Sequence, residues 1–236
     1  MYGVTAPNWD QLRDQMIETQ LQPRGIYDAR ILEAMRRVPR HLFVPEPARD
    51  RSYEDRALSI GFGQTISQPY MVAIMLRALA LTGSEKVLEI GTGTGYQAAL
   101  LAYLAKQVET VELVPELVAQ ARAALAALGI SNVHVHLTDG SHGLPGKAPF
   151  DAIIVAAGAP DVPPILLDQL ASGGKLLIPI GDRKQQEPQK QNCKCNAVLL
   201  DYQCGKSCDE QRKLEKLQYN DTSFPSSLTE SSLVVP

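Results

Sequence analysis

The segment from Val87 to Tyr96 constrains the fold most, because it joins an apolar, strand-like run to a helix through three glycines. Threonines separate these glycines, which are Gly91, Gly93 and Gly95. Glycine allows backbone angles that other residues resist, and it lets the backbone approach a ligand closely. The helix that follows the turn begins with free N–H groups. A strand, a glycine-rich turn and a helix in this order predict the first unit of an open α/β sheet.

Beyond the turn, apolar runs typical of strands alternate with segments typical of helices. The strand-like runs cover residues 86–90, 107–113, 133–137, 150–155 and 175–178. Helices are expected over residues 96–106, 115–129 and 163–170. Strands that alternate with helices are joined by right-handed crossovers, which produce a parallel sheet. The sequence therefore predicts an α/β fold of the Rossmann-like, doubly wound type, with a mostly parallel sheet.

The chain divides into three parts by composition. Residues 1–66 form a mixed helical lead, and residues 67–183 hold the alternating strands and helices. We expect residues 1–183 to form one domain. Residues 184–236 are rich in Lys, Gln, Ser and Asn, so an atypical and partly disordered C-terminal segment is expected there. Within it, the pattern predicts a strand over 197–202 and a short charged helix over 209–217.

Charge and composition limit the classes of partner. The 236 residues carry a net charge of −3 without a basic run, which disfavours a nucleic-acid partner. We find neither a run of membrane-spanning length nor a secretory leader, so a cytoplasmic monomer away from membranes is expected. No metal is expected, because the spacing of the four cysteines is not that of a standard zinc site. These cysteines are Cys193, Cys195, Cys204 and Cys208.

Acidic residues stand at the ends of the next two predicted strands. Glu112 lies about twenty residues beyond the glycine turn, where a carboxylate can accept hydrogen bonds from both ribose hydroxyls. Asp139, followed by Gly140, comes after the third strand, where an acid can accept from an adenine amino group. The alternatives are a solvated acid at Glu112 and an ordinary turn residue at Asp139. Carboxyl ends of parallel strands meet at one edge of a sheet, so this pattern predicts a composite nucleoside site.

The spacing of the glycines distinguishes between nucleoside cofactors. Dinucleotide enzymes use G-x-G-x-x-G, whereas this turn has the order G-x-G-x-G and follows Glu89 near the end of its strand. This spacing favours S-adenosyl-L-methionine, with the turn beside its amino-acid part and its ribose. The residues expected to bind this cofactor are Glu89, Gly91, Thr92, Gly93, Gly95, Glu112, Asp139 and Gly140.

Five segments together resemble the protein-L-isoaspartate O-methyltransferase family. The most specific is Gly61–Pro69, which contains Gln-Thr-Ile-Ser over residues 64–67. The others are residues 40–45, 87–96, 150–155 and 173–181. The glycine turn alone indicates only the large methyltransferase superfamily, whereas the Gln-Thr-Ile-Ser segment indicates this family. The resemblance covers roughly residues 8 to 183 and fades after Asp182.

The resemblance implies a seven-stranded class I methyltransferase sheet and a protein-repair activity. Family members transfer methyl from S-adenosylmethionine to the free carboxylate of an isoaspartyl residue, and the ester then collapses to a succinimide. By motif match, Ser67 is the active-site serine, with Thr65 beside it. The implied partners are isoaspartyl-containing proteins and peptides.

The chemistry of the reaction agrees with a hydroxyl at Ser67. A carboxylate is already anionic at neutral pH, so the site needs to orient it rather than deprotonate it. Ser67 precedes Pro69 and an apolar run, so we also expect its side chain to cap the helix that starts there. Two alternatives remain, which are a methyltransferase acting on another acceptor and a cofactor-binding protein without turnover.

Overall fold

The computed structural model describes residues 7–157, 161–180, 196–201 and 213–218. Its strands are β1 (Leu58–Gly61), β2 (Gln64–Ile66), β3 (Lys86–Ile90), β4 (Gln107–Glu112), β5 (Val133–Leu137), β6 (Phe150–Val155), β7 (Leu170–Ile180), β8 (Asn196–Asp201) and β9 (Lys213–Gln218). Its α-helices are α1 (Trp9–Met16), α2 (Ala29–Arg37), α3 (Pro69–Leu79), α4 (Tyr96–Leu104), α5 (Pro115–Ala127) and α6 (Pro164–Leu167). Short helical turns are η1 (Ile17–Leu21), η2 (Gln22–Arg24), η3 (Arg40–Phe43), η4 (Glu46–Arg51), η5 (Gly140–His142) and η6 (Pro145–Lys147).

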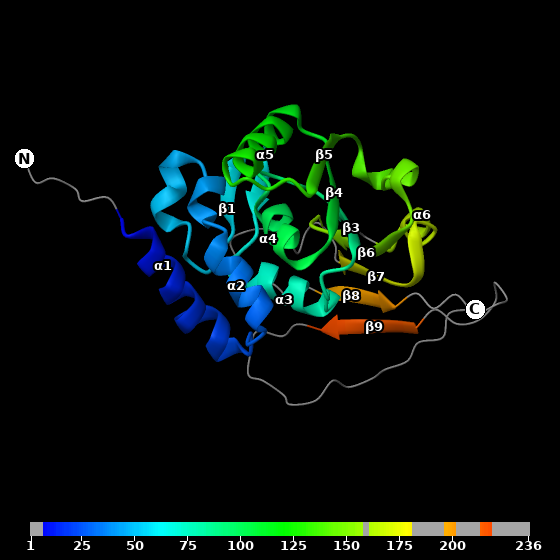
Figure 1. The fold of residues 1–236 in the computed structure, drawn as a ribbon, viewed down its shortest axis with the longest axis horizontal. Coiled ribbons are helices and arrows are strands. Elements are labelled where there is room, and N and C mark those ends of the chain that lie inside the picture. Colours follow the sequence, from blue (N-terminus) through cyan, green and yellow to red (C-terminus); the bar gives the residue numbers. More distant parts are fainter. Residues whose placement is uncertain (1–6, 158–160, 181–195, 202–212, 219–236) are drawn as a thin grey trace, which may run out of the picture.

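One sheet of seven strands organises the molecule, in the order β5-β4-β3-β6-β7-β8-β9 (Figure 1). The strands from β5 to β7 are parallel neighbours, while β8 and β9 add antiparallel pairs. This arrangement confirms the predicted α/β, Rossmann-like fold. From β3 the chain moves outward to β5 and then returns to β6 on the other side of β3, so the strand order reverses between β3 and β6. Open α/β sheets bind ligands beside such a reversal.

Alternate residues of the central strands belong to two separate hydrophobic clusters. Val87 and Ile154 belong to a large cluster that includes side chains of α1 to α5. Leu88 and Ile153 belong to a smaller cluster on the other side, against α6. Residues of a strand point alternately to its two faces, so the sheet is covered on both. The large cluster contains buried side chains of the helical lead, such as Ile31 and Phe43, together with those of the sheet.

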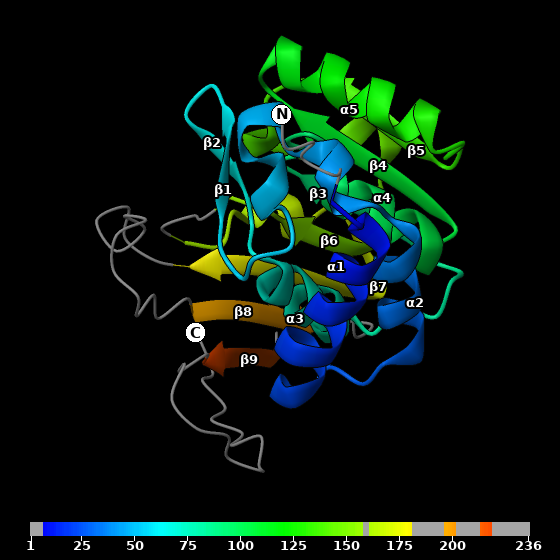
Figure 2. The ribbon, with the colours of Figure 1, turned by 90° about the vertical axis from the view of Figure 1, so that its left-hand side faces the viewer.

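A hairpin of β1 and β2 stands apart from the main sheet, over the carboxyl ends of its strands (Figure 2). The hairpin turns at Phe62, whose φ of 53° lies in the left-handed region. Gly61 and Gly63 on either side also have positive φ, at 86° and 69°. Three consecutive residues in this region make a tight reversal, which brings β2 back toward the sheet.

The C-terminal strands correct one prediction. Residues 213–217 were expected in a charged helix, but they lie in β9, which pairs antiparallel with β8. The neighbouring strand supplies backbone hydrogen bonds there, and these outweigh the helical preference of a short Lys- and Glu-containing segment. The predicted strand over 197–202 is confirmed by β8 within one residue at each end. The four cysteines lie outside the described residues.

The described part of the chain contains no helix that is both long and apolar enough to cross a bilayer.

Candidate functional site

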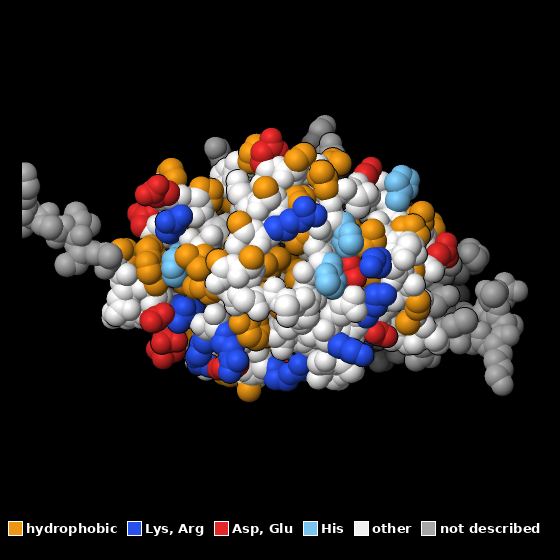
Figure 3. All heavy atoms as spheres, turned by 45° about the horizontal axis from the view of Figure 1, so that its top comes forward, with side chains coloured by type: hydrophobic (Ala, Val, Ile, Leu, Met, Phe, Trp, Pro, Cys, Tyr) orange, Lys and Arg blue, Asp and Glu red, His pale blue; other side chains and the backbone are white. Residues whose placement is uncertain are grey.

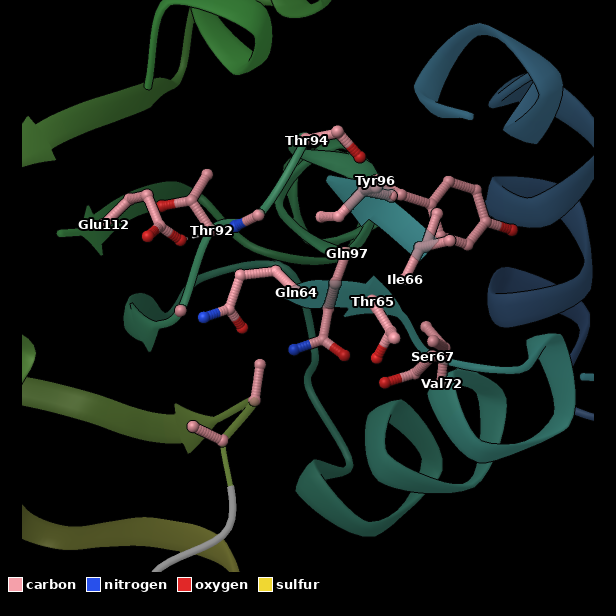
Figure 4. A pocket seen from close by; sticks show the side chains of 15 residues that line it. Gln64, Thr65, Ile66, Ser67, Val72, Thr92, Thr94, Tyr96, Gln97 and Glu112 are labelled. Carbon is pink, nitrogen blue, oxygen red and sulfur yellow. Dashed lines mark hydrogen bonds between the residues drawn. The ribbon is translucent and has the colours of Figure 1, made fainter. Parts of the chain in front are cut away.

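A pocket opens at the point where the strand order reverses. One wall comes from the hairpin and the residues after it, including Thr65 and Ser67. The opposite wall comes from the turn after β3 and from Glu112 at the end of β4 (Figure 4). Ala156 and Ala157, directly after β6, complete the pocket. The residues that line it come from widely separated parts of the sequence, and the sheet brings them together.

The glycine turn has the backbone that the sequence predicts. The φ angles of Gly91, Gly93 and Gly95 are 95°, 54° and 96°, in the region that favours glycine. At Gly95, an added Cβ atom would lie 3.1 Å from the Cβ of Ala121 in α5. The N–H groups of Gly91 and Thr92 donate to the Val111 carbonyl at 2.9 and 3.1 Å, which ties the turn to β4. The turn is therefore held close to both the neighbouring strand and the helix behind it.

Three backbone N–H groups hold the Glu112 carboxylate in place. Its Oε2 accepts from the N–H of Gly93 at 2.9 Å, and its Oε1 accepts from the N–H groups of Leu113 and Val114 at 2.9 and 3.1 Å. The side chain lines the pocket and is mostly buried. Each carboxylate oxygen can accept more than one hydrogen bond, so Glu112 can still receive hydroxyl groups of a ligand.

Glu89 lies behind the pocket and does not line it. The side chain is fully buried, and its Oε2 accepts a hydrogen bond of 2.6 Å from the Thr110 hydroxyl. That hydroxyl is also 2.6 Å from the hydroxyl of Thr92 in the glycine turn. Burial raises the pKa of Glu89 to about 8, although the Thr110 hydrogen bond opposes the shift. Glu89 is therefore mostly protonated at neutral pH and supports the turn through two threonines.

Asp139 and Gly140 also lie outside the residues that line the pocket. The carboxylate of Asp139 accepts from the N–H of Ser141 at 2.9 Å, and this hydrogen bond lowers the pKa of Asp139. Gly140 packs on the ends of β3 and β4, where an added Cβ atom would meet the Cγ2 atoms of Ile90 and Val111 at 2.5 and 3.0 Å. The absence of a side chain at Gly140 thus lets the segment after β5 lie flat against the carboxyl edge of the sheet.

Thr65 and Ser67 point into the pocket from the wall opposite Glu112 (Figure 4). The expectation that Ser67 caps the next helix is wrong. The N-cap of α3 is Gln68, which makes no side-chain cap hydrogen bond, and Pro69 occupies the first helical position. Proline has no N–H to be capped and fixes its own φ angle, so α3 begins without a serine cap. The Ser67 hydroxyl is consequently not used by the helix.

Several pocket residues were not predicted from the sequence. Ala156 and Ala157 follow a predicted strand, and the rule of the strand-order reversal would have indicated them. Thr94 and Gln97 also line the pocket, and the Gln97 amide interacts with the buried Glu89 carboxyl behind it. Gln97 therefore links the pocket to the support that Glu89 gives to the glycine turn.

The residues that the structure describes include no group of three or more His, Cys, Asp or Glu side chains that could hold a metal ion.

Solved structures share this architecture. One, described as a protein-L-isoaspartate O-methyltransferase, is 28% identical with a TM-score of 0.72, and the match covers 91% of this chain and 65% of that longer one. A second structure is that of a Plasmodium falciparum protein in complex with S-adenosyl-L-homocysteine, with a TM-score of 0.69 and 24% sequence identity. The match covers 96% of this chain and all of the Plasmodium chain, and at this identity it supports the fold alone. The fold and its site define an S-adenosylmethionine-dependent methyltransferase of the Rossmann-like class.

Sequence relatives narrow this class to one family. The family model of protein-L-isoaspartate(D-aspartate) O-methyltransferase matches residues 11–205. Protein-L-isoaspartate O-methyltransferase 1 of Syntrophobacter fumaroxidans is 56% identical over 180 residues, which are 76% of this chain and 84% of that protein. The Synechococcus sp. protein-L-isoaspartate O-methyltransferase is 59% identical over 170 residues, 72% of this chain and 70% of that protein. The chain belongs to this family, and the match extends through β8, beyond Asp182, where the resemblance was expected to fade.

Proposed function

We propose that the chain transfers the methyl group of S-adenosylmethionine to the free carboxylate of isoaspartyl residues in damaged proteins. One observation carries the proposal most directly. The hydroxyl side chains of Thr65 and Ser67 line the same pocket as the glycine turn and Glu112. A cofactor bound at the turn would therefore present its methyl group toward the wall that carries the two hydroxyls.

Residues in and around the pocket suit this cofactor. Glu112 would accept the ribose hydroxyls, and Gly91, Thr92, Gly93 and Gly95 would lie beside the ribose and the amino-acid part. Asp139 would accept from the adenine amino group, with Gly140 keeping the surface beside it flat. Glu89 would act from behind, by holding the turn through Thr110 and Thr92.

Catalysis in this pocket requires orientation rather than a strong base. When bound, S-adenosylmethionine supplies a methyl group that is already activated by a positively charged sulfur. An acceptor carboxylate is ionised at neutral pH, so Ser67 and Thr65 need only donate hydrogen bonds that aim one of its oxygens at the methyl carbon. The new bond is an O–CH3 ester bond, and the bond that breaks joins carbon to sulfur. The hairpin would shield the reacting atoms from water on the side of Thr65 and Ser67.

The biological role follows from the product. A methyl ester of an isoaspartyl residue collapses to a succinimide, which can reopen to normal aspartate, so the activity begins a repair cycle. The partners are damaged proteins and peptides, met in the cytoplasm by a monomeric enzyme. The face in Figure 3 shows basic and acidic side chains interspersed with apolar ones, a surface without the single-sign charge typical of nucleic-acid binding.

Methyl transfer to a matched pair of peptides tests the proposal. The peptides differ only in one isoaspartyl or aspartyl linkage, and the donor is S-adenosylmethionine labelled in its methyl group. We expect label in the isoaspartyl peptide alone. Label in neither peptide, with S-adenosylhomocysteine still bound in a calorimetric titration, would indicate a cofactor-binding protein without turnover. Label in both would indicate another acceptor specificity.

A further inference from the structure

Arg40, at the start of η3, is buried and forms no salt bridge with a carboxylate of the described residues. Its side chain has no exposed surface, and burial lowers the pKa of its guanidinium, which still remains charged at neutral pH. Nε donates to the carbonyl of Ser52 at 2.7 Å, and Nη2 donates to the carbonyl of Ser67 at 2.7 Å. The Tyr96 hydroxyl is a further polar neighbour of the guanidinium, and Asp55 contributes a longer-range favourable charge that opposes the lowering of the Arg40 pKa. Burying a charged guanidinium without a directly paired carboxylate is costly, so Arg40 is retained in the fold despite a desolvation penalty.

Two contacts of Arg40, with the Ser67 carbonyl and with the Tyr96 ring, involve residues that line the pocket. The Ser67 carbonyl belongs to the segment whose side chains form the acceptor wall. The guanidinium carbon also lies 4.8 Å from the ring centroid of Tyr96, which lines the pocket at the start of α4. Burial raises the pKa of the Tyr96 phenol to about 12, so this ring contributes no negative charge near neutral pH. The positive charge of Arg40 therefore stands directly behind the acceptor side of the pocket.

We propose that Arg40 is a positioning residue for the acceptor: its Nη2–H group holds the Ser67 carbonyl, and this fixes the direction in which the Ser67 hydroxyl enters the pocket. The inference rests on the proposed function above and names a further residue in it. Among the described residues, no other hydrogen bond holds the Ser67 side chain or its carbonyl, so Arg40 is the group that fixes this peptide between β2 and α3. The positive charge of Arg40 also favours an anionic group at the same wall.

Arg30 in α2 provides a matched control for a purely structural role. It also donates from one guanidinium to two backbone carbonyls, those of Leu81 and Leu104. Neither of these residues lines the pocket. Arg30 is exposed whereas Arg40 is buried, so the comparison is made on the rate of the folded protein and not on stability. If Arg40 only ties segments together, neither Arg30→Met nor Arg40→Met should slow that rate. If Arg40 positions Ser67, only Arg40→Met should slow the reaction of the folded protein.

The test compares Arg40→Met, Arg40→Lys, Arg30→Met, Ser67→Ala and the double variant Arg40→Met/Ser67→Ala. The turnover number and KM for an isoaspartyl peptide are measured per folded site, counted by titration with S-adenosylhomocysteine. We expect Arg40→Met to lower the turnover number by up to about tenfold and no more than Ser67→Ala, because it acts through the Ser67 hydroxyl, with the affinity for S-adenosylhomocysteine unchanged. Arg40→Lys should recover part of the rate, and Arg30→Met should keep it.

The double variant decides whether Arg40 acts through Ser67. If it does, removing both groups should slow the reaction no more than the worse single change, because residues that act as a unit are not additive. Multiplied losses, or an Arg40→Met protein with the wild-type turnover number, would overturn the inference alone. If Arg40→Met does not fold, the same comparison is made with Arg40→Lys. A wild-type protein that binds S-adenosylhomocysteine but methylates no isoaspartyl peptide would overturn the proposed function and this inference together.

Discussion

The N–H of Gly93 donates a hydrogen bond of 2.9 Å to the carboxylate of Glu112, and this contact joins the glycine turn after β3 to the end of β4. The two halves of the proposed nucleoside site are thus built as one unit. The same carboxylate accepts from Leu113 and Val114, so its position is set by the backbone before any ligand arrives. A preorganised acceptor loses little freedom when a ligand binds.

Glu112→Gln should weaken binding of S-adenosylhomocysteine by roughly 10–100-fold. The amide keeps one acceptor but loses the charge, and hydrogen bonds to charged groups contribute about 1.5–3 kcal/mol each. Isothermal titration calorimetry measures the change. Glu116→Gln, an exposed acid in the first turn of α5, serves as the control. Equal affinities for the two variants would exclude Glu112 from the cofactor site.

Ser67→Ala should reduce the turnover number for an isoaspartyl peptide about tenfold while leaving cofactor affinity intact. The expected loss corresponds to one hydrogen bond to a charged acceptor, about 1.5 kcal/mol. The Ser67 side chain does not cap α3, so the melting temperature should change little. Ser59→Ala, on the exposed side of β1, should match the wild type in steady-state kinetics. A large stability loss in Ser67→Ala would instead point to a structural role.

Glu89 should make the protein less stable as pH rises from about 5 to 8. The folded carboxyl has a pKa of about 8 against an ordinary value of 4.5, so between these values the folded state holds a proton that the unfolded chain has released. Raising the pH through this window therefore lowers the free energy of unfolding, at up to about 1.4 kcal/mol per pH unit. Glu89→Gln cannot titrate and should show a flatter dependence.

Thermal unfolding at pH 5, 6.5 and 8 measures this difference. Glu46→Gln, which changes an exposed acid, should keep the slope of the wild type. Parallel curves for wild type and Glu89→Gln would show that Glu89 does not retain its proton in the folded protein.

Gly95→Ala should destabilise the protein more than Gly129→Ala. Both glycines have positive φ, at 96° and 67°, so each substitution carries left-handed strain of about 1–2 kcal/mol. Only at Gly95 would the new Cβ atom also press on Ala121, at 3.1 Å from its Cβ and 3.3 Å from its Cα, whereas Gly129 faces open space. Overpacking adds about 1–3 kcal/mol. Denaturant unfolding compares the two, and equal losses would mean that α4 and α5 can move apart.

Local patterns were enough to predict the central strands. The bounds of β3 and β6 agree with mostly apolar runs, because a strand buried on both faces is mostly apolar along its length. The bounds of β5, an edge strand, agree with an alternation of apolar and histidine residues. The region of β9 was predicted wrongly, since its structure depends on a partner strand and not on its own sequence. The predicted helix cap at Ser67 was wrong, because Pro69 at the first helical position has no N–H group that needs a capping acceptor.

The candidate site shows the same division between local and long-range information. The glycine turn and Glu112 were predicted, because each stands at a strand end in a fold with a known binding edge. Arg40 was not predicted as a site residue, because its proposed role depends on a hydrogen bond to a residue 27 positions away in the chain. Ala156 and Ala157 carry no reactive group, and only the arrangement of the sheet places them in the pocket.

A crystal structure with S-adenosylhomocysteine and an isoaspartyl peptide bound together tests the central claim most directly. The claim is that one pocket, at the strand-order reversal, holds the cofactor and the acceptor at once. We expect the ribose hydroxyls on Glu112 and the isoaspartyl carboxylate within hydrogen-bonding distance of the Ser67 hydroxyl. A nucleoside bound away from the glycine turn, or a peptide carboxylate far from Thr65 and Ser67, would contradict the account.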